Sequence, residues 1–165
     1  MRVPRLAVVI LVLAVAIGCG GNDNSPTGPS ASASFSGTWT GTIGSATQVR
    51  WTATQSGGSV AGPVVLTSPV TNIVVTGVLT AAISGTTVSS LVLTVPPGGV
   101  AGFPNCSIAG SGSGTANATA SSISGTMTQT FTGCQGLVTG SSTDTIVLNK
   151  QSVEVEKWKS GEVEK

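Results

Sequence analysis

Polar and apolar side chains alternate along most of the chain between residues 35 and 150. In the segment FSGTWTGTI, Phe35, Trp39 and Ile43 fall on one face, and serine and threonine side chains occupy the other. Alternation with a period of two is typical of a β-strand that is buried on one side only. This segment therefore predicts a strand whose tryptophan side faces the core.

Seven further segments repeat the pattern, with turn-forming residues between or beside them. They are residues 47–55, 59–67, 71–81, 86–95, 107–120, 122–131 and 143–150. Many short strands at close spacing are typical of an up-and-down barrel or a sandwich. We therefore predict an all-β domain over residues 35–150, a single antiparallel up-and-down barrel of about eight strands, with a β-sandwich as the alternative. The apolar residues expected on the inward faces include Trp39, Trp51, Val64, Leu66, Ile73, Val75, Val92, Ile146 and Leu148.

The beginning of the chain follows a different pattern. Arg2 and Arg5 precede an unbroken apolar run over residues 6–17. These 12 residues are too few for a membrane-spanning helix, which needs roughly 20. A basic start, a short apolar core and small residues at its end are the parts of a secretory signal peptide. We therefore expect a signal peptide over residues 1–18 and an exported protein.

The apolar run ends in AIGC at residues 16–19, which resembles the lipobox of bacterial lipoproteins. In that family the cysteine is alkylated with diacylglycerol, and a peptidase cuts the chain just before it. The resemblance implies that Cys19 is lipidated, becomes the new N-terminus and anchors the protein in a membrane. Gly20 follows the cysteine, and in the sorting pattern of Gram-negative lipoproteins this implies the outer membrane. We expect a lipid-anchored protein of the outer membrane or cell envelope.

The segments on either side of the predicted domain have compositions of their own. Residues 19–34, with the lipidated cysteine, are rich in glycine, serine, asparagine and proline, and such a flexible tether reaches roughly 20 Å. Residues 151–165 are highly charged, and VEKWKSGE at residues 155–162 begins to repeat as VEK. This tail is either a charged interaction segment or a repetitive extension that adds nothing to the fold. We favour the second interpretation and expect a disordered tail.

Composition removes most catalytic chemistry from consideration. The chain contains no histidine, and between residues 24 and 149 its only ionisable side chains, cysteines aside, are Arg50 and Asp144. Serine–histidine and cysteine–histidine pairs are therefore excluded, as are the paired carboxylates of glycoside hydrolysis. Thr143 and Thr145 flank the single acid, and we expect their hydroxyls to stabilise its charged form. We predict a non-enzymatic protein with no catalytic residue and no cofactor.

The same composition restricts the partners. A net charge of +1 without clustered lysine or arginine argues against nucleic acid, because phosphate binding needs such clusters. Two cysteines, Cys106 and Cys134, remain in the domain, 28 residues apart. In an exported chain such a pair predicts a disulfide. Two buried thiols or a metal site are the alternatives, and the absence of histidine and of a CxxC motif argues against a metal.

Gly37-Thr38-Trp39 resembles the Gly-x-Trp motif that opens the first strand of lipocalins, and SGTW is similar to the start of avidin-like barrels. The resemblance implies an eight-stranded calycin-type barrel in which Trp39 plugs one end and the other end admits a ligand. The aromatic box with which avidins hold biotin has no counterpart, because the domain contains only Trp39, Trp51 and no tyrosine.

Two functions remain open for the domain. One is a module that binds a small apolar or sugar-like ligand in the barrel mouth. The other is a structural or protein-interaction module, including an inhibitor of an envelope-attacking enzyme. Phe103 lies in the longest predicted loop, residues 96–105, and either touches a partner there or packs onto the rim of its own barrel. We expect a monomer, and an open cavity beyond Trp39 would favour the ligand-binding function.

Overall fold

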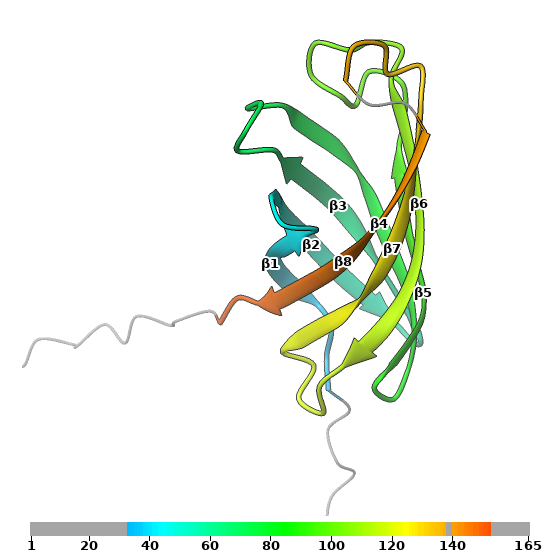
Figure 1. Ribbon diagram of the computed structural model, residues 1–165. Coiled ribbons are helices and arrows are strands. Elements are labelled where there is room, and N and C mark those ends of the chain that lie inside the picture. Colours follow the sequence, from blue (N-terminus) through cyan, green and yellow to red (C-terminus); the bar gives the residue numbers. More distant parts are fainter. Residues whose placement is uncertain (1–32, 138–139, 153–165) are drawn as a thin grey trace, which may run out of the picture. The chain divides into compact units, whose positions relative to one another are not determined.

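Eight antiparallel strands, connected in sequence order, form a closed barrel (Figure 1). The structure, a computed structural model, describes residues 33–137 and 140–152. The strands are β1 Gly37–Ile43, β2 Thr47–Ser56, β3 Ser59–Thr67, β4 Val74–Ser84, β5 Thr87–Val95, β6 Ser107–Ala116, β7 Ser122–Thr132 and β8 Gly140–Lys150. Each strand pairs with the next, and β1 pairs with β8. The predicted up-and-down barrel is confirmed, and the sandwich is excluded.

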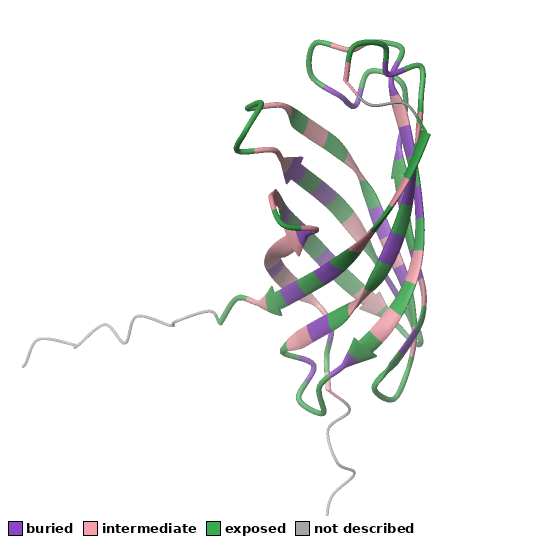
Figure 2. Cartoon of the chain, in the orientation of Figure 1, coloured by how far each residue is buried: buried purple, intermediate pink, exposed green. Residues whose placement is uncertain are grey.

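Buried and exposed residues alternate along the strands, as the period of two predicts (Figure 2). In β2, Val49, Trp51 and Ala53 are buried, whereas Arg50 between them is exposed. The inward side chains form one hydrophobic core along the barrel. Its largest fully buried members are Trp39, Trp51, Leu79, Leu91, Leu93, Ile123, Met127, Ile146 and Leu148.

Strand β5 departs from the predicted pattern. Val92, expected inside, lies on the outer face with 40% of its surface exposed, and Leu91 and Leu93 are buried instead. The pairing of β5 with β6 shifts register between Val88 and Leu91, so the strand carries an extra residue there. Such a bulge reverses the phase of the alternation. The prediction for Val92 was therefore wrong because it assumed an uninterrupted strand.

The predicted strand over residues 107–120 is too long at its C-terminal end. The side-chain oxygen Oδ1 of Asn117 accepts hydrogen bonds from the backbone N–H groups of Ser121 and Ser122, at 2.8 and 3.1 Å. Asparagine favours turns for this reason, because its side chain replaces a backbone partner. Ala120 adopts a positive φ of 50° within the turn. The chain therefore leaves the ladder after β6 and returns as β7.

Glycines on the inward face allow the narrow barrel to close. A Cβ at Gly41 in β1 would overlap the backbone carbonyl oxygen of Val147 in β8. Glycine within a strand often marks a tight bend or a close approach of two backbones. Added Cβ atoms would likewise overlap neighbouring carbonyl oxygens at Gly62, Gly112, Gly114 and Gly125. These positions therefore serve the curvature of the wall.

One end of the barrel is filled by aromatic side chains. Trp39 is completely buried, with its ring centroid 6.1 Å from that of Phe35 and 6.3 Å from that of Trp51. Its indole Nε1 donates a hydrogen bond of 2.9 Å to the backbone oxygen of Phe35. The indole Nε1 of Trp51 is also buried, but it has no hydrogen-bond partner among the described residues. Trp39 thus lies at the end of the barrel that the aromatic side chains fill, which is the position expected for a plug.

The described chain enters and leaves the barrel at this aromatic end. The Nζ of Lys150 donates a 2.7 Å hydrogen bond to the backbone oxygen of Ser34. Just beyond β8, the backbone N–H of Gln151 donates to the oxygen of Thr38, at 2.8 Å. The two ends of the described chain are therefore neighbours.

Several predictions lie outside the described residues. They are the signal peptide, the lipidation of Cys19, the tether up to residue 32 and the tail from residue 153. Within residues 33–137 and 140–152, no helix is long and apolar enough to cross a membrane.

Comparing the two tryptophans measures how much the hydrogen bond of Trp39 contributes to the free energy of unfolding. Trp39→Phe and Trp51→Phe remove the same atoms from the same core, but only the first removes a hydrogen bond and leaves a carbonyl oxygen unpaired. We expect Trp39→Phe to lower the free energy of unfolding by about 1 kcal/mol more than Trp51→Phe does. Urea unfolding followed by circular dichroism measures both values. Equal losses would mean that the bond to Phe35 contributes nothing net.

Candidate functional site

A cavity of about 370 Å³ opens at the end of the barrel opposite the aromatic cluster. This end, called the mouth below, is the upper end in Figure 1. Its apolar walls are made by inward-facing residues of β1, β3, β4, β6 and β7. They are Ile43, Leu66, Val75, Ile108 and Phe131. Ligand pockets have volumes of about 300–1,000 Å³ and mostly apolar walls, so the cavity suits one small molecule.

The cavity is confined to the mouth, because the rest of the interior is filled. Met127 and Ile146 lie inside the barrel and are fully buried. Trp39 and Trp51 are not among the residues that line the cavity. A ligand held in the mouth would therefore rest on aliphatic side chains and would not touch the tryptophan at the far end.

The longest loop, between β5 and β6, forms part of the mouth. Its Val100 is buried and pairs with Val75 in an isolated β-bridge. Beside this bridge, the N–H of Thr76 donates to the oxygen of Gly99 at 2.7 Å. The loop thus continues the ladder beside β4 where β5 has ended, and its position is set by backbone hydrogen bonds.

Phe103 lies in the same loop. Its side chain is half-buried and packs against the core, while its N–H donates a 3.0 Å hydrogen bond to the oxygen of Val100. The structure thus places Phe103 on the rim of the barrel. A contact of Phe103 with a partner stays a prediction.

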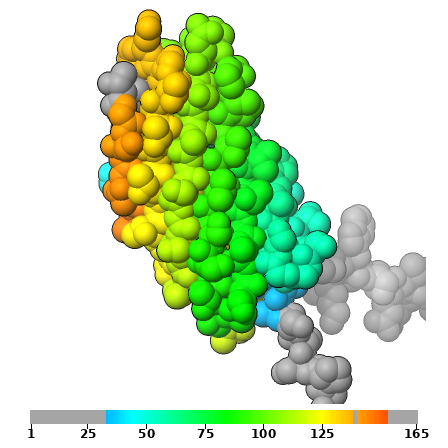
Figure 3. Space-filling view, turned by 90° about the vertical axis from the view of Figure 1, so that its right-hand side faces the viewer, coloured from blue at the N-terminus to red at the C-terminus, as the bar shows by residue number. Residues whose placement is uncertain are grey.

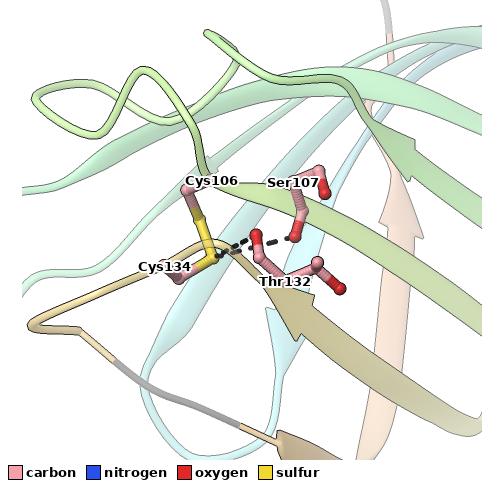
Figure 4. The surroundings of a disulfide bond; sticks show 4 residues. All are labelled: Cys106, Ser107, Thr132 and Cys134. Carbon is pink, nitrogen blue, oxygen red and sulfur yellow. Dashed lines mark hydrogen bonds between the residues drawn. A yellow bond between two sulfur atoms is a disulfide. The ribbon is translucent and has the colours of Figure 1, made fainter.

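A disulfide joins the two chain segments that flank the β6–β7 hairpin at the mouth. Cys106 and Cys134 are bonded (Figure 4), as the sequence predicts. Cys106 also lines the cavity. The Sγ of Cys134 lies 3.4 Å from the oxygen of Thr132 and 3.7 Å from that of Ser107. A disulfide sulfur carries no proton, so these are polar contacts and not hydrogen bonds. The disulfide connects the long loop to the segment after β7.

Three polar side chains project from β7 and β8 into the apolar mouth. Gln129, Ser142 and Asp144 line the cavity. The Oγ of Ser142 donates a 3.0 Å hydrogen bond to Oδ2 of Asp144, and it is the only hydrogen bond to this carboxylate that we find within the described residues. Gln129 is 7% exposed, and among the described residues its carboxamide makes no hydrogen bond. The mouth therefore combines aliphatic walls with unused polar groups.

The neighbours of Asp144 differ from those expected. Thr143 and Thr145 are exposed on the outer face, and the hydroxyl of Thr143 pairs with that of Thr128 at 2.8 Å. Successive side chains of a strand point to opposite faces. The expectation that these threonines stabilise the carboxylate was therefore wrong, and Ser142, two residues away on the same face, does so instead.

The carboxylate of Asp144 has no cationic neighbour in the described part of the chain. The described part of the chain has two cationic side chains, Arg50 and Lys150. Arg50 is exposed on β2, and Lys150 bonds to Ser34 at the aromatic end. Within residues 33–137 and 140–152, no three histidine, cysteine or acidic side chains are grouped to hold a metal ion. Among the described residues, no cationic side chain therefore lies beside Asp144 at the mouth.

Gln129 was not predicted as a site residue, although the alternation in β7 indicates that it faces inward. Met127, Gln129 and Phe131 alternate with threonines in β7, so the glutamine shares an otherwise apolar inward face. Asp144 shares the face of Ile146 and Leu148 in the same way. A polar residue in phase with buried apolar residues is the signal that could have found both.

No protein-family model matches this chain, and a search of the curated proteins also gives no match. The fold and the site therefore rest on the geometry alone.

The disulfide should contribute to stability. Closing a loop of this length reduces the entropy of the unfolded chain, and the chain-entropy model gives about 3–4 kcal/mol. We expect the double variant Cys106→Ala/Cys134→Ala to unfold at a correspondingly lower urea concentration.

The pairing itself can be tested by thiol titration of protein taken from its native compartment, with Cys19 removed by cleavage before residue 20. Titration of this protein, unfolded but not reduced, should find no free thiol. Two free thiols would contradict the pairing.

Proposed function

We propose that this chain is a lipid-anchored protein of the cell envelope whose barrel binds one small ligand at its mouth without transforming it. The observation that carries the proposal is the cavity of about 370 Å³, which has apolar walls and a few polar groups. Such a combination is the usual composition of a small-molecule site.

The architecture also supports a relationship to the calycins. The chain has eight antiparallel strands in sequence order, and the tryptophan of its Gly-x-Trp segment is buried in β1. The resemblance to lipocalins and avidin-like barrels rests on these features. The pocket differs from a deep calyx because side chains fill the interior beyond the mouth.

Binding requires less of this chain than catalysis would. General acid–base catalysis needs a proton donor or acceptor poised near the operating pH and close to the substrate. Asp144 is the only acid in the described residues, and its one hydrogen bond comes from a serine hydroxyl. The mouth offers shape, apolar surface and hydrogen-bonding groups, and these are sufficient for binding.

The anchor and the mouth are compatible. The chain enters β1 at the aromatic end, and the cavity opens at the other end. The segment that would carry the anchor therefore joins the barrel at the end away from the mouth.

The outer wall keeps the protein-interaction function as a second candidate. Valines on the outer faces of neighbouring strands β3, β4 and β5 are partly exposed, namely Val65 at 38%, Val78 at 46% and Val92 at 40%. Figure 3 shows the outer wall of the barrel, with these strands in teal and green. Within the described residues, the only charged side chains are Arg50, Asp144 and Lys150. An uncharged wall with exposed valines is suited to contact with another protein.

The anchor can be tested in cells. Cys19→Ala should leave an uncut precursor that incorporates no labelled fatty acid, because the thiol is the proposed attachment site. Ser25→Ala, in the same tether, is the control and should be processed normally. Unchanged labelling of the Cys19→Ala protein would remove the basis for the localisation.

The pocket can be tested by filling it. Ile108 lines the cavity, and Ala109 beside it is exposed on the outer face. We expect Ile108→Trp to weaken the binding of a fluorescent apolar probe at least about tenfold by occupying the mouth, and Ala109→Trp to leave it unchanged. Circular dichroism would establish that both variants fold, and Ser68→Trp on the rim is a second blocking variant.

Equal binding by the filled and control variants would overturn the mouth as the site. In a separate experiment, mass spectrometry of molecules that co-purify with the natively extracted, unsubstituted protein distinguishes the two candidate functions. A bound small molecule supports the first, and a protein partner supports the second.

A further inference from the structure

We propose that the mouth selects ligands that carry an ammonium group on a small apolar body, and that Asp144 and Gln129 receive this group. The inference rests on the proposed ligand-binding function and deepens it by naming the class of ligand.

The first step is the unused capacity of the carboxylate. Asp144 is partly buried in β8, and its only hydrogen bond within the described residues is the one that Ser142 donates to Oδ2. An ionised carboxylate can accept about four hydrogen bonds. The other oxygen, Oδ1, is therefore available to a donor that enters the cavity.

The second step is the missing counter-charge. Asp144 is partly exposed at an open cavity, and a ligand that displaces water from its carboxylate does so at a cost unless the ligand pairs with the charge. In the described ranges, Arg50 and Lys150 are the only cationic side chains, and neither lies at the mouth. A cationic ligand would supply the partner that the barrel itself does not supply there.

The third step is a second acceptor on the neighbouring strand. In the β7–β8 ladder, Gln129 is opposite Ser142 and Met127 is opposite Asp144. Gln129 and Asp144 are therefore diagonal neighbours on the inward face, and diagonal neighbours have Cα atoms roughly 7–8 Å apart. An ammonium group has several N–H donors, so it can bond to Oδ1 of Asp144 and to the carboxamide oxygen of Gln129 together.

The fourth step is the shape and chemistry of the remaining walls. Ile43, Leu66, Val75 and Ile108 are aliphatic, and the space measures about 370 Å³. These walls can bury a short hydrocarbon body, and the side chains of Ser45, Thr47, Ser68 and Thr71 also line the cavity. A ligand with a carboxylate would place a second negative charge beside Asp144 and would be disfavoured.

The test compares three ligands of one chain length on the purified full chain: n-hexylamine, n-hexanol and hexanoate. Isothermal titration calorimetry at neutral pH measures each affinity. We expect the amine to bind at least about tenfold more tightly than the alcohol, because hydrogen bonds to charged groups are the stronger ones. Hexanoate should bind most weakly.

Asp144→Asn should abolish the preference for the amine and leave hexanol binding unchanged. The matched control, Thr145→Asn, makes a similar change on the outer face of the same strand and should preserve the preference. Gln129→Leu should weaken the binding of n-hexylamine and leave the binding of n-hexanol unchanged. If Asp144→Asn does not fold, the unmodified protein still gives a test, because raising the ionic strength from about 0.01 to about 1 M should weaken the amine alone.

The outcomes distinguish a failure of the ammonium site from a failure of the proposed ligand-binding function. Equal affinities for amine and alcohol, or a preference for hexanoate, would overturn the ammonium site and leave the apolar pocket standing. A preference for the amine that survives Asp144→Asn would also overturn it. If none of the three ligands binds, and the apolar probe does not bind either, the proposed function itself is wrong.

Discussion

The pairing of β1 with β8 is the contact on which the rest of the structure depends. Five residue pairs, from Trp39 opposite Lys150 to Ile43 opposite Ile146, join the first strand to the last. Without this ladder the sheet would have two open edges, each with unpaired backbone groups. The close approach at Gly41 makes the junction possible. Closure creates an interior from which water is excluded. Alternate side chains of each strand point into this interior or toward water, and this arrangement explains the period of two in the sequence.

This dependence explains how much of the fold could be predicted. Every strand has one buried face, so its apolar residues had to recur at alternate positions, and the eight segments were recognisable. The errors fall where a local event interrupts that rule. The bulge in β5 adds one residue among ordinary polar ones, Ser89 and Ser90. The turn after β6 depends on the side chain of Asn117, which reads like any other polar residue in an alternating segment.

The mouth was harder to predict, for a different reason. Alternation tells which residues point inward, but it does not tell whether they fill the space. The interior is full around Met127 and open around Ile108, and the difference depends on the sum of side-chain volumes from several strands. The bridge between Val75 and Val100 also joins a strand to a distant loop, and no local pattern marks it. Asp144 was recognisable as an inward residue but was considered only as a possible catalyst.

The neighbouring ends of the described chain have a mechanical consequence. If the mouth end of the barrel were held while the chain was pulled at residue 33, the force would run along β1. The ladders that flank β1 have hydrogen bonds perpendicular to the strands, so this pull would load them in shear and they would share it. A pull that separated residue 33 from residue 152 would instead open the β1–β8 ladder from one end, one bond after another. The barrel should thus resist tension applied along β1 at residue 33 more strongly than tension that separates residue 33 from residue 152.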